Sequence, residues 1–104
     1  MPKIYRGDTL PVVVNYDGYK FQPGDVITAG ILQLNESTEE YEVLKEIFLT
    51  VTAEADEAQL EFSREDMQNI SGDVILEVRT VTIANVEMTI QKNLSLRKDG
   101  LRWA

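Results

Sequence analysis

The sequence contains no cysteine and no histidine. Without cysteine, the chain has neither a disulfide scaffold nor a thiolate zinc site. Without histidine, the Ser-His-Asp and Cys-His catalytic systems are excluded, as are metal sites built on imidazole. The six glycines are spread singly along the chain, so no glycine-rich phosphate-binding loop is present. We therefore expect a non-enzymatic protein that needs no cofactor.

Long apolar runs and basic clusters are also lacking. No run approaches the roughly 20 apolar residues of a membrane helix, and residues 1–8 contain no apolar segment of the signal-peptide type. The chain has 18 acidic and 10 basic residues, a net charge of −8. Its basic cluster is small: Arg97, Lys98 and Arg102. Because nucleic-acid binding depends on clustered Lys and Arg, we expect no nucleic-acid partner. Because no apolar run has the length of a membrane helix, we expect no membrane partner.

The pattern that is present most clearly lies in residues 86–96. Every second side chain there is apolar, with Lys92 as the exception, and the side chains between them are polar. Successive side chains of a strand point to opposite faces, so the pattern predicts a strand with one buried face. Residues 74–80 alternate in the same way just before it. Together the two segments predict a hairpin, which needs a second apolar layer to cover it.

Short apolar runs recur along the chain, separated by Gly, Asp and Asn at intervals of roughly 8–12 residues. The sequence predicts one domain, residues 1–104, with an all-β fold: an antiparallel immunoglobulin-like β-sandwich of about seven strands with one short helical turn. The helical turn is expected at residues 63–69, because Ser63 can cap a first turn that carries acidic residues. The expected strands are residues 4–6, 9–15, 26–34, 41–49, 59–62, 74–80 and 86–96.

The residues of several predicted strands indicate where each strand lies within its sheet. Pro11 cannot donate to a ladder, so residues 9–15 are expected either to lie at a sheet edge or to begin near Pro11. Residues 26–34 are apolar on both parities, which is typical of a central strand covered on both faces, although the parity switch near Gly30 also fits a bulge. Residues 41–49 have an ambiguous period, and the β-branched residues that follow them favour a strand.

The acidic residues cluster in predicted loops, and we interpret them as solvated surface. Calcium is the cation best suited to such oxygen-rich loops, but the Asp-x-Asp-x-Asp-Gly spacing of a calcium-binding loop is absent. The clustered acids are Glu36, Glu39, Glu40, Glu42, Glu54, Asp56 and Glu57.

Two groups of aromatic residues are candidates for contact with other molecules. Tyr16, Tyr19 and Phe21 surround an Asp-Gly turn, where they either form a platform for stacking a sugar or alternate inward as core. A sugar platform would make the chain a carbohydrate-binding or adhesion module, which is the alternative function. Trp103 and Leu101 lie near the last residue and are the candidate interface, because such residues either fold back or fill a neighbour's pocket.

Two short segments carry a resemblance to a known family. Residues 4–9, Ile-Tyr-Arg-Gly-Asp-Thr, precede a hydrophobic strand, and a polar segment with the pattern Ser-x-Glu-Asp-x-x-x-Ile-x-Gly precedes the final hairpin. The residues that match the second pattern are Ser63, Glu65, Asp66, Ile70 and Gly72. In this layout the chain resembles the N-terminal immunoglobulin-like domain of phage baseplate upper proteins and related tail or fibre attachment domains.

The resemblance implies a structural assembly role in the tail, baseplate or fibre attachment of a phage or prophage particle. It implies that the protein is made in the host bacterial cytoplasm and resides in the virion. Its expected partners are other virion proteins or further copies of itself, through protein–protein contacts.

Overall fold

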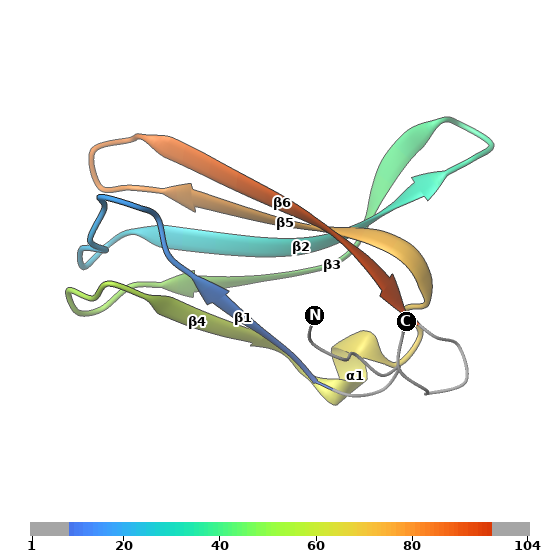
Figure 1. Ribbon diagram of the computed structural model, residues 1–104, viewed down its shortest axis with the longest axis horizontal. Coiled ribbons are helices and arrows are strands. Elements are labelled where there is room, and N and C mark those ends of the chain that lie inside the picture. The colour runs from blue at the N-terminus through green and yellow to red at the C-terminus, as the bar shows by residue number, and fades with distance from the viewer. Residues whose placement is uncertain (1–8, 97–104) are drawn as a thin grey trace.

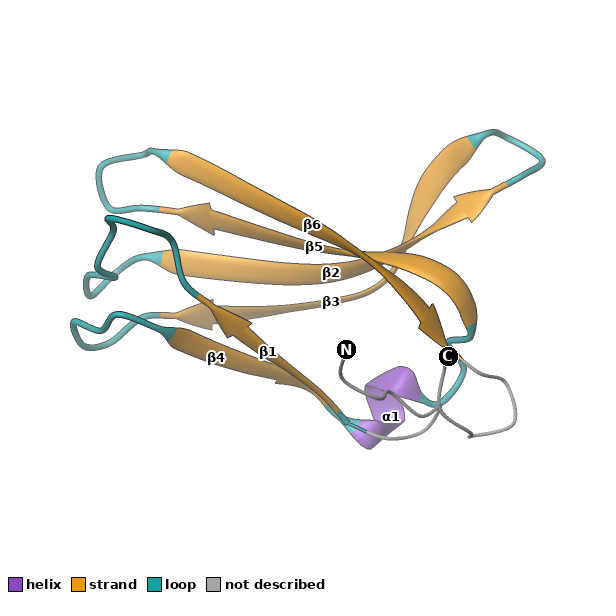
Figure 2. Cartoon of the chain, viewed as in Figure 1, coloured by secondary structure: helices purple, strands orange, loops and turns teal. Residues whose placement is uncertain are grey.

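The computed structural model describes residues 9–96, which form two antiparallel sheets packed face to face and one helical turn (Figure 1, Figure 2). Six of the seven expected strands are present, and residues 4–6, expected to form the other, lie outside the described residues. The elements are β1 Leu10–Val14, β2 Val26–Asn35, β3 Glu40–Thr50, β4 Ala58–Phe62, α1 Arg64–Met67, β5 Gly72–Val81 and β6 Glu87–Leu96.

The strand order is that of an immunoglobulin-like sandwich. One sheet has the order β3-β2-β5-β6, and the other pairs β1 with β4. The chain therefore crosses between the sheets after β1, after β3 and after β4, while β2–β3 and β5–β6 are hairpins within one sheet. This Greek-key crossing confirms the predicted fold class. The edge position predicted from Pro11 is also confirmed, since β1 pairs only with β4 among the described strands.

The hydrophobic core lies between the sheets and is formed by side chains that are buried at alternate positions along the strands. β1 and β4 bury every second residue, and β5 does the same along most of its length. Burial of these side chains is the main force that holds the two sheets together. Segments between strands also contribute, because Phe21 and Met67 are 0% exposed. The largest fully buried hydrophobic side chains are Phe21, Phe62, Ile27, Ile31, Met67 and Val14.

β2 occupies the centre of its sheet, as predicted, but only one of its faces is covered. Ile27 and Ile31 on the inner face are 0% exposed. On the outer face, Val26 is 36% exposed and Leu34 is 46% exposed. The prediction that both faces are covered is therefore wrong. The physical reason is that β1 and β4 provide a single second layer, on the inner side.

A β-bulge interrupts the β2–β3 hairpin. Ile31 pairs with Lys45 and Leu32 pairs with Val43, so Leu44 is the extra residue in β3. Bulges bend the strand and increase its twist. Beyond the bulge the hairpin rises away from the rest of the sheet, at the upper right of Figure 1. The bulge suggested by the parity switch near Gly30 is therefore found beside that position, but in β3 and not in residues 26–34. It accounts for the ambiguous period of residues 41–49.

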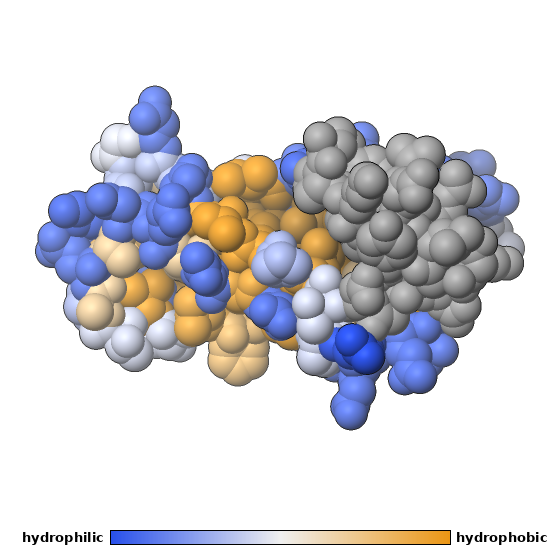
Figure 3. Space-filling model, turned by 60° about the horizontal axis from the view of Figure 1, so that its bottom comes forward, coloured by the Kyte–Doolittle hydropathy of each residue, from blue (hydrophilic) through white to orange (hydrophobic). Residues whose placement is uncertain are grey.

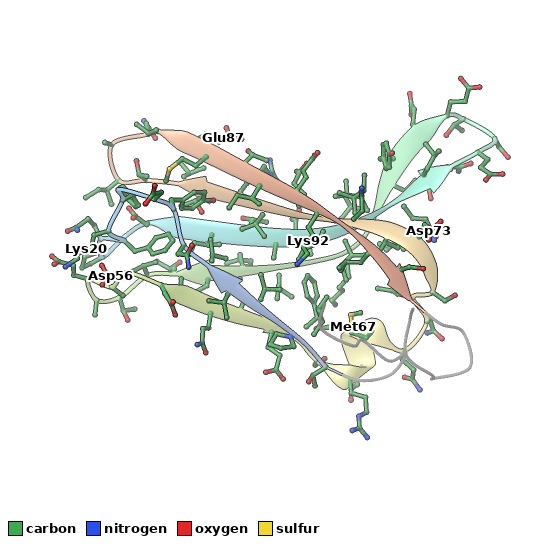
Figure 4. All side chains as sticks on the ribbon, viewed as in Figure 1. Lys20, Asp56, Met67, Asp73, Glu87 and Lys92 are labelled. Carbon is green, nitrogen blue, oxygen red and sulfur yellow. The ribbon has the colours of Figure 1, made fainter. Side chains whose placement is uncertain are left out.

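Among the described strands, the second sheet is narrower than the first, and the apolar face of β6 is only partly covered. Ile90 pairs with Val78 and points to the inner side, yet it is 42% exposed while Val78 is 4% exposed. Lys92 lies on the same side of β6 (Figure 4) and is also exposed. In the space-filling view, hydrophobic surface gathers in the middle of the face that comes forward (Figure 3). The strand predicted at residues 86–96 is confirmed as β6, but the buried apolar face is not: Leu94 is buried, whereas Ile90 and Val86 are exposed, and Val86 precedes the strand.

The helical turn α1 is capped as the sequence predicts. The hydroxyl of Ser63 accepts from the Asp66 N–H at 3.2 Å, and the Asp66 carboxylate accepts from the Ser63 N–H at 2.9 Å. This reciprocal pair satisfies donors that a helix start leaves free. The Asp66 carboxylate also lies 3.1 Å from Nζ of Lys45, which ties the turn to β3. The turn thereby closes one end of the sandwich.

Candidate interaction surfaces

The aromatic residues around the Asp-Gly turn pack against one another and against the core. Gly18 has φ +78°, and the Tyr19 N–H donates to the Tyr16 carbonyl at 3.1 Å to close the turn. Both tyrosine rings contact the ring of Phe21 edge-on, at centroid distances of 6.0 and 5.7 Å. Tyr16 and Tyr19 are half-buried, and Phe21 is 0% exposed. Phe21 therefore offers no face on which a sugar can stack.

The tyrosine hydroxyls are engaged inside the fold. The Tyr16 hydroxyl lies 2.9 Å from Oγ1 of Thr80, and the Tyr19 hydroxyl donates to the Asp25 carboxylate. These contacts favour the core interpretation of the aromatic turn over the sugar platform. The turn acts as a cover over β5 and the start of β2.

A buried carboxylate that the sequence did not single out lies under this turn. Asp25 is 0% exposed and accepts hydrogen bonds from the N–H groups of Gln22 at 3.0 Å and Ile83 at 2.9 Å, as well as from the Tyr19 hydroxyl. Burial by itself raises the pKa of Asp25, but the three hydrogen bonds together outweigh it and hold the pKa below the usual value. The same Asp25 hydrogen bond, aided by burial and the nearby charge, raises the pKa of Tyr19 to about 12.

Asp25 was missed because nothing in the local sequence distinguishes a buried aspartate from a turn aspartate. It follows Pro23-Gly24, a combination that marks a turn wherever it occurs. Two of its hydrogen-bond donors, Tyr19 and Gln22, are close to it in the sequence, whereas the third, Ile83, is 58 positions away. We assign Asp25 a structural role, since its ionised oxygens are satisfied by groups of the fold.

A polar hollow of about 650 Å³ lies beside the aromatic turn. Lys20 projects into this region, with its Nζ 3.5 Å from the Glu54 carboxylate and 3.9 Å from that of Asp56 (Figure 4). These side chains are more than half exposed, so water screens the pairs and each contributes little. Within residues 9–96, no three acidic side chains gather as ligands for a metal ion.

The outer face of the four-stranded sheet carries an exposed apolar cluster. Phe48 of β3 is 75% exposed, the highest value among the large apolar side chains that the structure describes. Its pairing partner is Thr28 of β2. Two positions away along β2, Val26 pairs with Val81, and these residues are 36% and 42% exposed. We call Val26, Phe48 and Val81 the outer apolar patch. Exposed clusters of this kind often mark interaction sites.

Charged and polar residues follow the patch along the same face. The guanidinium of Arg79 lies 3.7 Å from the Glu46 carboxylate and 3.6 Å from that of Glu77. The Gln91 amide donates to Glu77 at 2.7 Å. This row crosses all four strands of the sheet and borders the outer apolar patch on one side. The face therefore combines an apolar cluster with a polar margin.

A groove lies at the other end of the same face, which we call the hairpin groove. It has a volume of about 440 Å³ and lies between the raised β2–β3 hairpin and the ends of β5 and β6. Asp73, labelled in Figure 4, lies on the β5 side of the groove. The residues that line it are Leu34, Tyr41, Asp73, Val74, Ile75, Asn93, Leu94 and Ser95.

The candidate interface residues Leu101 and Trp103 lie outside the described residues, as does the basic cluster. In the part of the chain that the structure describes, no helix has the length and apolar character required to cross a membrane. Comparisons of the chain with protein-family models, with curated proteins and with solved structures find no significant match.

Proposed function

We propose that this chain is a non-enzymatic assembly module that packs against other proteins of a phage or prophage particle. The particle is suggested by the sequence resemblance. The observation that supports packing is the outer apolar patch, with Phe48 at 75% exposure beside Val26 and Val81. Complete burial of one fully exposed side chain of this kind contributes about 1.5–3 kcal/mol, and the three side chains of the patch are already partly buried. A partner that covers the patch therefore gains roughly 2–4 kcal/mol before ordering costs.

The surroundings of the patch favour a protein as the partner. Thr28 and Thr50 lie beside it on the outer face, and Arg79 with its two glutamates follows. An apolar centre with a polar margin is the usual anatomy of a protein–protein interface. The face is built on paired strands, so the backbone that carries these side chains is already ordered before a partner binds, which lowers the entropy cost of binding.

The test uses Phe48→Ser with Val13→Ser as the matched control. Val13 is also an exposed apolar strand residue, at 55%, but it lies on β1 in the other sheet. Tagged chains are produced in the bacterium that makes the particles, and mass spectrometry measures how much of each chain is retained in purified particles.

We expect the original chain and Val13→Ser to be retained in stoichiometric amounts. Phe48→Ser should be depleted, with an unchanged melting temperature, because only the contact surface is altered. Absence of the original chain from purified particles would reject the particle assignment. Full retention of Phe48→Ser would reject the outer apolar patch as the contact.

A further inference from the structure

We propose that the hairpin groove binds a neutral saccharide. This inference goes beyond the assembly role and uses a different part of the outer face. It also differs from the sugar platform considered around Tyr16, Tyr19 and Phe21, because that platform lies at the opposite end of the sandwich and contains a buried ring.

The groove is built by the backbone. Pairing between β2 and β5 ends at Leu32–Ile75, yet both strands continue, β2 to Asn35 and β5 back to Gly72. The two strand ends separate because the bulge in β3 turns the hairpin away. Nε2 of Gln33 donates to the Ser71 carbonyl at 2.9 Å across the split, which ties the two walls together. A hollow of about 440 Å³ fixed in this way falls in the size range of small-molecule sites.

The hairpin wall of the groove is apolar and carries an aromatic ring. Leu34 and Tyr41 are cross-strand partners on the outer face, at 46% and 55% exposure. Ile75, half-buried, continues the apolar surface on the β5 side. An exposed tyrosine ring beside aliphatic side chains offers a flat apolar surface with a polar hydroxyl at its tip. The C–H face of a pyranose ring suits such a surface.

The opposite wall is polar. Asp73 pairs with Ser95, and Ile75 pairs with Asn93, so the three polar side chains lie on one face of neighbouring strands. Beyond the backbone pairing of β5 with β6, the side chains of Asp73, Asn93 and Ser95 make no hydrogen bond or ion pair with another described residue. A carboxylate, an amide and a hydroxyl together supply both donors and acceptors. Vicinal sugar hydroxyls, each a donor and an acceptor, match this set.

The two walls together decide the class of ligand. A purely apolar ligand would cover the polar wall and leave its groups without water, which is costly. An anionic sugar would meet Asp73, the charged residue among the described groove residues, on a chain of net charge −8. A neutral saccharide places its C–H face on Tyr41 and its hydroxyls on the polar wall without either cost.

The experiment is an NMR titration of the full ¹⁵N-labelled chain. The probes are neutral oligosaccharides of glucose, galactose and N-acetylhexosamine units, together with one uronic-acid oligosaccharide. We expect a neutral probe to cause saturable shifts of the amides in residues 34–41, 73–75 and 93–95. Tyr41→Ala should weaken binding by roughly tenfold or more. Phe48→Ala removes an exposed ring from the same strand and face outside the groove, and it should bind as the original chain does.

Asn93→Ala is the second variant, so that a folding defect in Tyr41→Ala does not decide the outcome. It should also weaken binding. The inference is overturned when no neutral probe shifts the groove amides, when the shifts map to the aromatic turn, when the uronic acid binds more tightly, or when both variants bind normally. Phe48→Ser should lose retention in particles while keeping saccharide binding, so the two proposals fail separately.

Discussion

The Asp25 carboxylate accepts a hydrogen bond from the backbone N–H of Ile83 at 2.9 Å, across 58 positions of sequence. This contact joins the start of β2 to the turn between β5 and β6. The same carboxylate holds the N–H of Gln22 and the hydroxyl of Tyr19. One buried side chain therefore fastens three segments at one end of the sandwich, and removal of its charge should loosen all three.

Asp25→Asn should destabilise the fold by about 2 kcal/mol. The amide keeps one acceptor oxygen but places an NH₂ group against donors that the carboxylate satisfied. The free energy of unfolding in urea measures the change. Asp56→Asn is the control, because Asp56 is an exposed acid near the same end, and its effect should stay within about 0.5 kcal/mol. Equal effects of the two variants would show that Asp25 contributes no special stability.

Acid should destabilise the protein in a way that depends on Asp25. The pKa values of Asp25 and Asp66 lie below the usual aspartate value in the folded state, the latter chiefly through the hydrogen bond from the Ser63 N–H. A depressed folded-state pKa contributes stability above the unfolded value, and this stability is lost as the pH falls through the folded value.

The melting temperature should therefore be nearly constant from neutral pH down to about pH 5 and should fall below about pH 4. Thermal unfolding followed by circular dichroism measures it. Asp25→Asn should show a shallower fall, because one of the two linked carboxyls is gone. An equally steep fall in both proteins would contradict the link between Asp25 and acid sensitivity.

Gly24→Ala should cost more stability than Gly18→Ala. Both glycines have positive φ, +100° and +78° respectively. A Cβ at Gly18 meets nothing within 4 Å, whereas a Cβ at Gly24 lies 2.8 Å from Cγ2 of Ile83. Backbone strain alone should cost Gly18→Ala about 1 kcal/mol, and strain plus the clash should cost Gly24→Ala about 2–3 kcal/mol.

The double variant Gly24→Ala with Ile83→Ala separates the two contributions to the Gly24 effect. It should recover the part due to the clash but keep the part due to backbone strain. Urea unfolding of Gly18→Ala, Gly24→Ala and the double variant gives the free energies of unfolding to compare. No recovery in the double variant would mean that the clash with Ile83 is relieved by other movements.

Ser63→Ala should destabilise the protein by about 1 kcal/mol. The substitution removes the hydroxyl that accepts from the Asp66 N–H and leaves that donor without its cap. Ser37→Ala, in the exposed tip of the β2–β3 hairpin, is the control and should be nearly neutral. Chemical unfolding measures both variants. A neutral Ser63→Ala would show that packing of Met67, and not the cap, holds the turn.

Strand positions were predictable because alternation is a local property. Residues 74–80 and 86–96 show period 2, and the structure pairs them as β5 and β6. Ser63 and the acidic residues after it predicted the helical turn for the same local reason. The assembly role, the particle and the interface residues Leu101 and Trp103 remain predictions.

Other features could not be predicted because they depend on residues far apart. The apolar character of residues 26–34 suggested a strand covered on both faces, whereas Val26 lies in the open outer patch. In the sequence, Asp25 resembles an ordinary turn residue, and only the fold places the Ile83 N–H within hydrogen-bond distance of it. The hairpin groove combines Tyr41 with Asp73 and Ser95, which no spacing in the sequence connects.

The sequence by itself determined which side chains alternate, where the turns fall and which kinds of catalysis are excluded, because period and composition need no knowledge of distant neighbours. Only the tertiary structure decided which apolar faces stay open and which polar groups meet. Coverage depends on how many strands cross to the second sheet, and here β1 and β4 cover the inner side of β2 and β5. The outer face, with its patch and its groove, is what that arrangement leaves uncovered.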